Sequence, residues 1–288
     1  MHMINRDEPR PSVPCDSTRA DVDIGVIYTH ERQYLPRLVT SLAASADSHR
    51  ARLLLVDNDS VDLDERWADC FPRRTLLRNA RRLHYSANLN RILTAATARY
   101  ALLLNTDMFF DPAQQCVSKL VQFMDTHADC GVAGCRLYHA DGGYAFPARR
   151  FQGPAVVLAR RFGLARPLAR SLAHYLYLDR DPASTFECKW LSGCLMMVRI
   201  EAARAVGMFD ERFVKYFEDV DFCLRMAQAG WRVVFYGGTH AFHLEQRASK
   251  SLLARDAWQH VRSYLRFARK WGARPHIAIA DPCKRPAA

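Results

Sequence analysis

Short apolar runs alternate along the chain with longer segments in which apolar residues recur every three or four positions. The short runs have the length of buried strands, and the longer segments have the period of amphipathic helices. In the first half the pattern predicts strands at Val22–Thr29, Arg52–Val56, Thr75–Arg78, Tyr100–Leu104 and Gly131–Tyr138, and helices at Tyr34–Ser45, Ser86–Ala98 and from Asp111 to about His127. This alternation predicts an α/β fold with a mostly parallel central sheet and helices on both faces.

The second half of the chain has a less regular pattern. It predicts strands at Cys194–Val198 and Trp231–Tyr236, and short helices at Glu201–Val206 and Asp219–Ala229. Gly230 follows the second helix directly, as expected of the left-handed residue that ends a helix. The apolar residues of Ser251–Trp271 recur at helical spacing and predict a C-terminal amphipathic helix. Residues 1–20 have no periodicity and are expected to form a flexible tail.

Four polar residues stand where the predicted strands of the first half end. Thr29 follows the first strand, Asp57 and Asp59 follow the second, and Asp107 follows the strand that ends at residue 104. In open parallel sheets the ligand site lies beyond the carboxyl ends of the strands. The pattern therefore predicts a ligand site shared by these side chains. The structural alternative is an Asx turn, in which an aspartate stabilises only its own loop.

A second polar cluster lies in the run 217–221, where Glu218, Asp219 and Asp221 begin a predicted helix. Like charges this close repel one another, so such clusters are typical of sites with a chemical or structural purpose. A positioned carboxylate can remove the proton of an attacking hydroxyl group. The alternative is that the acids stabilise the positive end of the helix dipole. Asp221 and Arg225 are four residues apart, which predicts a structural ion pair.

The composition is that of an ordinary globular protein, with 49% hydrophobic and 25% charged residues among 288. These values argue against extensive disorder. The nine cysteines form no CxxC pair, so we expect buried free thiols and a reducing cytoplasm. No apolar run approaches the ~18 residues that span a bilayer. The acidic, proline-containing start of the chain is unlike a secretory signal.

The net charge of +11 is concentrated in two segments. Residues 148–180 contain seven arginines and one acid, and residues 246–288 contain ten basic residues and two acids. Both segments also carry apolar residues. This combination favours either helices that pack on the domain with a solvated basic face, or contact with an anionic membrane. No nucleic-acid-binding motif accompanies the charge, so no nucleic-acid partner is expected.

Several distinctive segments follow one another in unbroken order across residues 21–250. They are Val26-Ile27-Tyr28-Thr29, Leu55-Val56-Asp57-Asn58-Asp59-Ser60, Asn105-Thr106-Asp107, Trp190-Leu191-Ser192-Gly193-Cys194-Leu195, Gly207-Met208-Phe209-Asp210-Glu211-Arg212-Phe213 and Phe217-Glu218-Asp219-Val220-Asp221. This set resembles the family 2 glycosyltransferases, which are inverting enzymes of the Rossmann-like GT-A fold. The resemblance implies a nucleotide-sugar-binding half at 21–135 and an acceptor-binding, catalytic half at 136–250, followed by a basic helix and tail at 251–288.

The resemblance also implies a nucleotide site and a divalent metal, Mg²⁺ or Mn²⁺. The residues that it assigns to the nucleotide are Thr29, Asp57, Asp59 and Asp107. Asp107 matches the carboxylate that holds the metal, where a hard cation would neutralise charge on a departing diphosphate. Asn105 departs from the two-carboxylate form of this motif, although the N-x-D form also occurs in the family. His243 matches a position that often supplies a further metal ligand, and a structural histidine is the alternative.

The catalytic assignments come from the same resemblance. Asp219 is the implied base, and Glu218 beside it is expected to position the base or the acceptor. Trp190 and Gly193 are expected to line the cleft for the acceptor and the donor sugar, where a glycine allows close approach of the backbone. Core packing accounts equally well for Trp190.

The motifs together most resemble those of members that transfer rhamnose from dTDP-rhamnose in cell-surface polysaccharide assembly. The expected reaction moves a sugar from a nucleoside diphosphate to a hydroxyl of a glycan or lipid-linked glycan, with inversion. The alternatives are a UDP-hexose or UDP-N-acetylhexosamine donor, and a catalytically silent nucleotide-binding or scaffold protein. A nucleotidyltransferase would carry a glycine-rich, lysine-containing first loop, unlike Thr29-His30-Glu31-Arg32. We expect the protein in the cytoplasm, either free or in peripheral contact with the inner face of a membrane.

Overall fold

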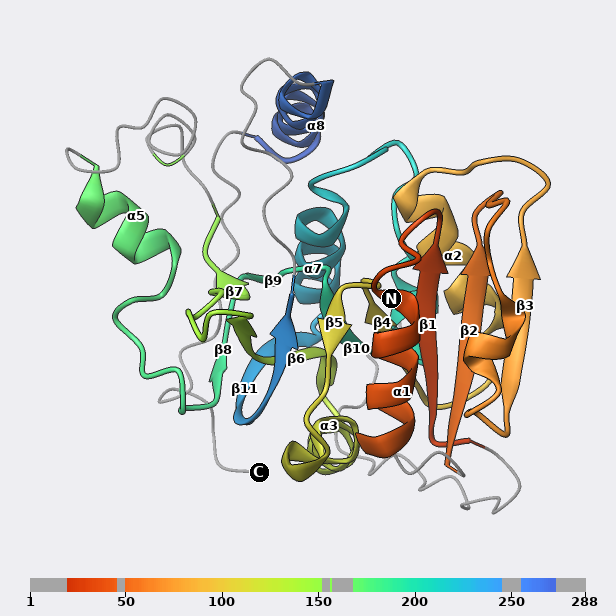
Figure 1. Cartoon of the computed structure of the whole chain (residues 1–288). Coiled ribbons are helices and arrows are strands. Elements are labelled where there is room, and N and C mark those ends of the chain that lie inside the picture. Colours follow the sequence, from red (N-terminus) through yellow and green to blue (C-terminus); the bar gives the residue numbers. More distant parts are fainter. Residues whose placement is uncertain (1–19, 46–49, 152–155, 157–167, 245–254, 273–288) are drawn as a thin grey trace, which may run out of the picture.

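A nine-stranded sheet runs through the centre of the protein, and helices cover both of its faces (Figure 1). The computed structural model describes residues 20–45, 50–151, 156, 168–244 and 255–272. The strands of this sheet are β1 (Val22–Tyr28), β2 (Ala51–Asp57), β3 (Arg74–Arg78), β4 (Tyr100–Leu104), β5 (Met108–Phe109), β6 (Cys130–His139), β8 (Phe186–Glu187), β10 (Leu195–Arg199) and β11 (Arg232–His243). The predicted α/β class with a mostly parallel sheet is confirmed.

The order of the strands is β3-β2-β1-β4-β10-β6-β11-β5, and β8 pairs with β11 beside this path. β1 to β4 are parallel neighbours, and β6 is parallel to β11. β10 runs antiparallel to both of its neighbours, β4 and β6. A separate ladder joins β7 (Ala148–Arg149) to β9 (Trp190–Leu191). The carboxyl ends of β1, β2 and β4 therefore meet at one edge, as the sequence pattern requires of a shared ligand site.

The helices divide into two layers. They are α1 (Leu35–Ser45), α2 (Tyr85–Ala95), α3 (Cys116–Thr126), α5 (Ala169–Tyr175), α6 (Ile200–Ala205), α7 (Glu218–Gln228) and α8 (Arg255–Trp271), with short 3-10 turns η1 (Glu65–Ala68) and η2 (Pro112–Gln114). Buried residues of α1 and α3 form one hydrophobic core with one face of the sheet. Those of α2, α6 and α7 form a second core on the opposite face.

Alternation along the strands explains the two cores. In β4, Leu102 belongs to the first core and Leu103 to the second, because successive side chains point to opposite faces of a sheet. Gly25 of β1 allows α2 to pack closely. A Cβ atom at this position would lie 2.4 Å from Cγ2 of Ile92, which is too close for any side chain.

Two sequence predictions need correction. Asp111 caps the 3-10 turn η2, where its side chain accepts a hydrogen bond from Ala113 N, and not the following α-helix. Gln115 then turns through a left-handed conformation (φ 48°) before α3 begins. The strand expected to end at Tyr236 continues to His243, because an irregularity between Tyr236 and His240 lets β11 resume pairing with β6. This continuation brings His243 into the sheet.

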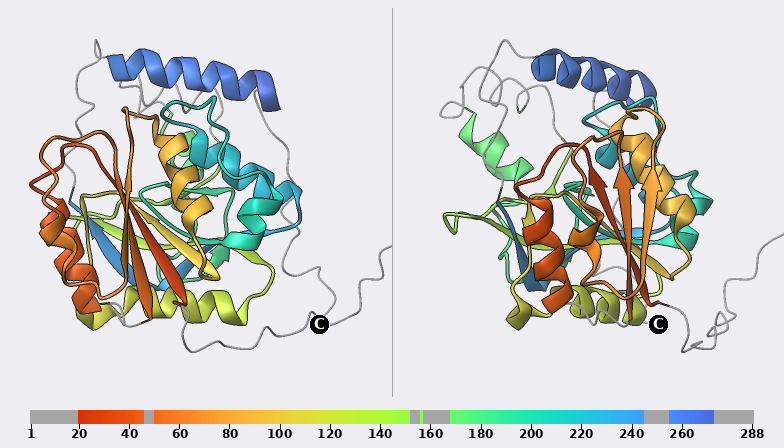
Figure 2. Two further views of the ribbon diagram at one scale, coloured as in Figure 1. Left: turned by 90° about the vertical axis from the view of Figure 1, so that its right-hand side faces the viewer. Right: turned by 45° about the vertical axis from the view of Figure 1, so that its right-hand side comes forward.

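The C-terminal helix α8 is confirmed where the structure describes it, and it packs across the start of α7 (Figure 2). Asp221 of α7 is fully buried. It pairs with Arg225 at 2.8 Å and with Lys270 of α8 at 2.7 Å, and it accepts a hydrogen bond from Trp271 Nε1 at 2.7 Å. The predicted structural pair of Asp221 and Arg225 is thus part of a larger clamp, which joins α7 to α8.

The predicted buried thiols and the predicted tail have different outcomes. Six of the seven cysteines that the structure describes are buried and free, and Cys70 is exposed. The predicted tail at 1–20 lies almost wholly outside the described residues. Within the described ranges, no helix combines the length and the apolar character needed to cross a membrane.

Candidate active site

Asp107 and His243 meet because of strand pairing. Asp107 follows β4 and precedes β5, and β5 pairs with the end of β11 so that Met108 lies opposite His243. Asp107 O accepts a hydrogen bond from Leu244 N at 2.8 Å. His243 Nε2 lies 3.2 Å from Asp107 Oδ2. The structure therefore brings together two residues that are far apart in the sequence and that both belong to the predicted metal site.

The chemistry of this pair suits a divalent cation. Nε2 of His243 is buried and lacks a partner in hydrogen-bond geometry, although the carboxylate of Asp107 is close. A carboxylate and an unpartnered imidazole nitrogen that face the same point can both bind a third group. No cluster of three or more His, Cys, Asp or Glu side chains with metal-binding geometry occurs in the described part of the chain.

The acid pair, Glu218 and Asp219, opens α7 after an unusual turn. Tyr216 and Phe217 both have positive φ angles, 69° and 70°. Bulky residues in this region cost about 1–3 kcal/mol each, and such strain persists only where packing enforces it. Here α8 supplies the packing, since the Phe217 ring contacts those of His260, Tyr264 and Phe267.

The two acids have different partners. Asp219 is half-buried, and its Oδ2 and Oδ1 accept hydrogen bonds from Gly193 N at 3.0 Å and Val220 N at 2.8 Å. Glu218 is 6% exposed, and its buried Oε2 has no hydrogen-bond partner. A buried polar atom without a partner is costly, so such atoms often mark sites that a ligand completes.

Burial separates the proton affinities of the pair. Burial, followed by the charge of Asp219, raises the pKa of Glu218 to about 8, so this side chain holds a proton at neutral pH. Burial also raises the pKa of Asp219. The N–H donors of Gly193 and Val220 act in the opposite direction, and so does the positive charge of Arg149. Hydrogen bonds to the charged form favour ionisation. The arrangement therefore holds a neutral acid next to a carboxylate that N–H groups support.

Tyr85 connects the acid pair to the segment that contains Asp107, and the sequence analysis did not identify it. Its hydroxyl group lies 2.9 Å from Asn105 Oδ1 and 3.3 Å from Gly193 O. Burial strongly raises the pKa of Tyr85, and the nearby charges of Glu218, Asp219 and Asp107 add to this effect. One phenol thus lies within electrostatic reach of all three carboxyl groups. Its place at the start of a helix after β3 gave no signal of this role.

The predicted nucleoside residues form a compact polar turn beyond β1 and β2. Asp57 is 3% exposed, and its Oδ1 accepts hydrogen bonds from Ser60 N at 2.9 Å and Ser60 Oγ at 2.7 Å. Its Oδ2 pairs with Arg78 at 2.8 Å. Asp57 therefore stabilises its own loop, as the structural alternative expected, although it does so through Ser60, three residues on, and not through the two-residue spacing of an Asx turn. Thr29 Oγ1 lies 3.3 Å from Asn58 Nδ2, which joins the turn to the end of β1.

Asp59 lies on the outer side of this turn. It is exposed and has a positive φ of 59°, a conformation that aspartate tolerates better than most residues. The structure therefore places Asp57, Thr29 and Asp59 at the same edge of the sheet. Only the side chain of Asp59 among them is open to solvent.

Trp190 and Gly193 have different surroundings. Trp190 is 5% exposed, its Nε1 donates to Arg150 O at 2.9 Å, and its ring lies 5.0 Å from the Arg149 guanidinium. Core packing therefore describes Trp190, and Arg149 covers its ring. Gly193 faces Asp219, where a Cβ atom would meet Asp219 Cβ at 3.5 Å, an ordinary contact. What this glycine contributes in the structure is its N–H group.

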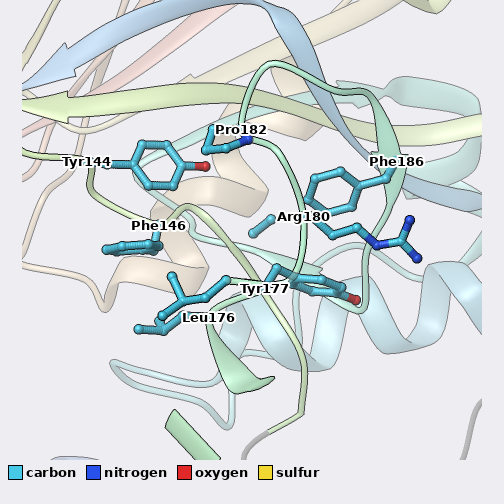
Figure 3. Close-up of a pocket in the computed structure, with 9 residues that line it drawn as sticks. Tyr144, Phe146, Leu176, Tyr177, Arg180, Pro182 and Phe186 are labelled. Atoms are coloured by element: carbon cyan, nitrogen blue, oxygen red, sulfur yellow. The ribbon is translucent and has the colours of Figure 1, made fainter. Parts of the chain in front are cut away.

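A small pocket is lined by residues around β7 and by residues between α5 and β8. Its volume is about 160 Å³, and its walls are mainly aromatic and aliphatic: Tyr144, Phe146, Ala148, Leu176, Tyr177, Leu178, Arg180, Pro182 and Phe186. Figure 3 shows the aromatic side chains gathering from three separate segments. None of the residues predicted from the sequence to form the site lines this pocket. It adjoins the site through β7, in which Ala148 faces the pocket and Arg149 lies over Trp190.

Solved structures of glycosyltransferases share this fold. The mannosyltransferase PcManGT from Pyrobaculum calidifontis, in complex with GDP-Man and Mn²⁺, has a TM-score of 0.60 at 18% identity, over 91% of this chain and 68% of its own. GalNAc-T7 with UDP, GalNAc and Mn²⁺ has a TM-score of 0.60 at 13% identity, over 89% of this chain and 49% of its own. The fold therefore belongs to the GT-A class of glycosyltransferases.

Sequence comparison narrows this class. The family model described as Glycosyl transferase family 2 matches residues 23–207, more than half of the chain. The protein belongs to this family and is a glycosyltransferase. The match ends before Glu218, so the acid pair lies beyond the matched segment.

Curated relatives of the chain include rhamnosyltransferases. N-acetylglucosaminyl-diphospho-decaprenol L-rhamnosyltransferase of Mycobacterium tuberculosis is 26% identical over 245 residues, which cover 80% of this chain and 77% of that protein. O-antigen biosynthesis protein RfbC of Myxococcus xanthus is 29% identical over 259 residues, 84% of this chain and 19% of that protein. Rhamnosyltransferase WbbL of Escherichia coli K12 is 34% identical over 82 residues, 28% of this chain and 31% of that protein.

Proposed function

We propose that this glycosyltransferase moves rhamnose, with inversion, from dTDP-rhamnose to a hydroxyl group of a glycan or lipid-linked glycan. The names of the relatives support rhamnose as the sugar, and the decaprenol-linked substrate in one name supports a lipid-linked acceptor. The observation that carries the proposal is the network Asn105–Tyr85–Gly193–Asp219, because it connects the segment of Asp107 to a buried acid pair.

Asp219 is the proposed base. The acceptor oxygen attacks the anomeric carbon of the donor sugar, and the bond from that carbon to the diphosphate oxygen breaks. The acceptor proton passes to the Asp219 carboxylate, which the N–H groups of Gly193 and Val220 hold in place. A positioned base contributes about 10²–10⁴-fold to such a step. Glu218, which is neutral at pH 7, can donate a hydrogen bond without adding a second negative charge.

Asp107 and His243 would hold a divalent metal, Mg²⁺ or Mn²⁺. The structural neighbours PcManGT and GalNAc-T7, whose structures contain Mn²⁺, support this assignment, and so does the unpartnered Nε2 of His243. A bound cation would neutralise negative charge on the departing diphosphate. Thr29, Asp57 and Asp59 would form the nucleoside end of the site. Because Asp57 already has partners in Ser60 and Arg78, its proposed role is mainly to hold the turn in shape.

The acceptor would enter from the side of β7. Arg149 lies over the Trp190 ring and its positive charge acts on Asp219, and the pocket lined by Ala148 has a mainly apolar wall with Arg180 as its charged residue. We assign donor binding to residues 21–135 and acceptor binding and catalysis to residues 136–250, as the sequence motifs suggest. A pocket of about 160 Å³ has room for one small ring, such as a single sugar ring that packs its apolar face on the aromatic wall.

The test is a thermal-shift panel followed by a transfer assay. We expect dTDP and dTDP-rhamnose to raise the melting temperature in the presence of Mn²⁺. At a nucleotide concentration a hundredfold above Kd, the free energy of unfolding should increase by about 2.7 kcal/mol. Asp107→Asn should lose the part that depends on Mn²⁺, whereas Asp69→Asn, a surface acid, should not. No stabilisation by any nucleotide would contradict the proposal. A larger effect of UDP or GDP would change the donor, and binding without transfer to any glycan acceptor would favour a silent member.

A further inference from the structure

The outer face of α8 exposes large apolar side chains that the catalytic domain does not cover. Trp258 is 76% exposed, Leu265 is 51% exposed and Val261 is 40% exposed. Their spacing of three and four residues places them in one stripe along the helix. Exposed apolar residues that occur singly are ordinary, but a continuous stripe marks a contact surface.

The inner face of the same helix is firmly attached. Ser263 is fully buried and its Oγ donates to Lys215 O at 2.7 Å. Phe267 is 5% exposed and packs on Phe217, and Lys270 pairs with Asp210 and Asp221 at 2.7 Å. Because these contacts fix the rotation of α8, the stripe points outward as a consequence of the fold.

Positive charge borders the stripe. Arg262 and Arg269 are exposed, and their positions follow Trp258 and Leu265 by four residues each, so they share the outer face. A helix face with tryptophan and leucine beside arginine is typical of segments that lie in the interface of a membrane. A second copy of the chain is a poorer partner, because two such faces would bring like charges together.

We propose that α8 docks this enzyme on the surface of an anionic membrane. Trp258, Val261 and Leu265 enter the interfacial layer, and Arg262 and Arg269 contact lipid phosphates. Since Ser263 and Phe267 hold the segment that immediately precedes Glu218, docking brings the acid pair close to the bilayer surface. Membrane docking does not depend on the identity of the donor sugar, so it can be tested apart from the proposed function.

The test is flotation of the full chain with vesicles of phosphatidylcholine, with and without phosphatidylglycerol. We expect binding to the anionic vesicles only, weakened by added salt because exposed charges are screened. Trp258→Ser with Leu265→Ser should reduce the partition coefficient by more than about tenfold. Arg262→Glu with Arg269→Glu should reduce it by at least about tenfold. All four side chains are exposed, so the melting temperature should stay unchanged.

Two control variants make the test specific. Val61 is 96% exposed and does not belong to α8, and Val61→Ser should leave vesicle binding unchanged. Arg81→Glu with Arg82→Glu changes the net charge as much as the α8 variant does, at exposed positions after β3, and should bind nearly as well as the unchanged protein. Equal binding by all variants would overturn the proposal. So would a change of mass in light scattering for Trp258→Ser with Leu265→Ser, since the stripe would then join two copies.

Discussion

Two buried carboxyl groups on the first turn of α7 have opposite surroundings. Asp221 is 0% exposed and has Arg225, Lys270 and Trp271 as partners. Glu218 lies three residues earlier, is 6% exposed, and has an oxygen atom without any partner. The carboxylate of Asp221, at the centre of the region that we call the clamp, is fully partnered, because Arg225 contacts one oxygen and Lys270 and Trp271 contact the other. The region around Glu218 and Asp219, the acid pair, is not fully partnered.

This difference separates structural from chemical carboxylates. Burying an ionised carboxylate costs free energy, and this cost is offset when charged and hydrogen-bonding partners surround it, as in the clamp. The acid pair keeps raised pKa values and a strained entry through Tyr216 and Phe217. The clamp supports that strain, because α8 packs on Phe217. The clamp is therefore the scaffold of the acid pair. Mutations in the clamp should mainly lower stability, and mutations in the acid pair should mainly lower turnover.

The largest effect is expected at the base. Asp219→Asn keeps the size of the side chain and can keep the contact with Gly193, but it cannot take a proton. The turnover number should fall about 10²–10⁴-fold, with donor binding and melting temperature nearly unchanged. Steady-state kinetics and thermal shift with dTDP-rhamnose measure both. Full turnover by this variant would show that Asp219 is not the base. The acid pair would then have no chemical role that distinguishes it from the clamp.

The next largest effect is on stability. Asp221→Ala leaves Arg225 and Lys270 without their shared partner, and should cost about 3 kcal/mol of unfolding free energy in urea titrations. Turnover per folded molecule should change much less than in Asp219→Asn. Asp179→Ala is a matched control, because its pair with Arg150 is 54% exposed on the aspartate side and exposed pairs contribute about 1 kcal/mol or less. Equal costs for the two variants would show that burial is not what distinguishes the clamp.

A comparable effect should appear as pH dependence at Glu218. Its folded pKa of about 8 lies above the model-compound value of 4.5, so the folded state binds the proton more tightly. Stability should therefore fall as pH rises from about 4.5 to about 8. Glu218→Gln removes this contribution and should gain roughly 3–4 kcal/mol relative to the unchanged protein between pH 5 and pH 8. A stability difference that stays constant over this range would contradict the raised pKa.

The smallest effect is expected at the link between the regions of the site. Tyr85→Phe removes the hydrogen bonds to Asn105 and Gly193 and should lower turnover about fivefold, from roughly 1 kcal/mol. Tyr100→Phe is the matched control, because its hydroxyl bonds Asp125 at the other end of β4. Both variants should lose similar stability, and only the first should lose turnover. If both slow the reaction equally, Tyr85 has no positioning role.

Much of the fold followed from local patterns. Period-two and period-3.6 alternation placed the longer strands and most helices of the described chain close to their observed bounds, but it did not predict the two-residue strands β5, β7, β8 and β9. The errors came where tertiary contacts override local preference. β11 runs seven residues further than expected, since pairing with β6 and β5 extends it to His243. Asp111 caps η2 because Gln115 turns the chain before α3.

The site was predictable in part. The position of Thr29, Asp57 and Asp107 after predicted strands located them at one edge of the sheet, because the carboxyl ends of parallel strands lie at the same edge. Tyr85 and Arg149 gave no such signal. Trp190 could not be assigned, because a buried and a cleft-lining tryptophan look alike in a sequence. Only packing shows that Arg149 covers the Trp190 ring.

The sequence by itself determined the class of fold and the family, and it singled out the acidic cluster at 217–221. Periodicity and the order of motifs can be read from neighbouring residues, without knowledge of tertiary contacts. The tertiary structure alone decided that Asp221 gains further partners from α8 and that one oxygen of Glu218 has no partner. Gly193 stands 26 residues from Asp219, and Trp271 stands 50 residues from Asp221. The pKa of a carboxyl group depends on such distant partners and on burial, and neither is encoded in the residues beside it.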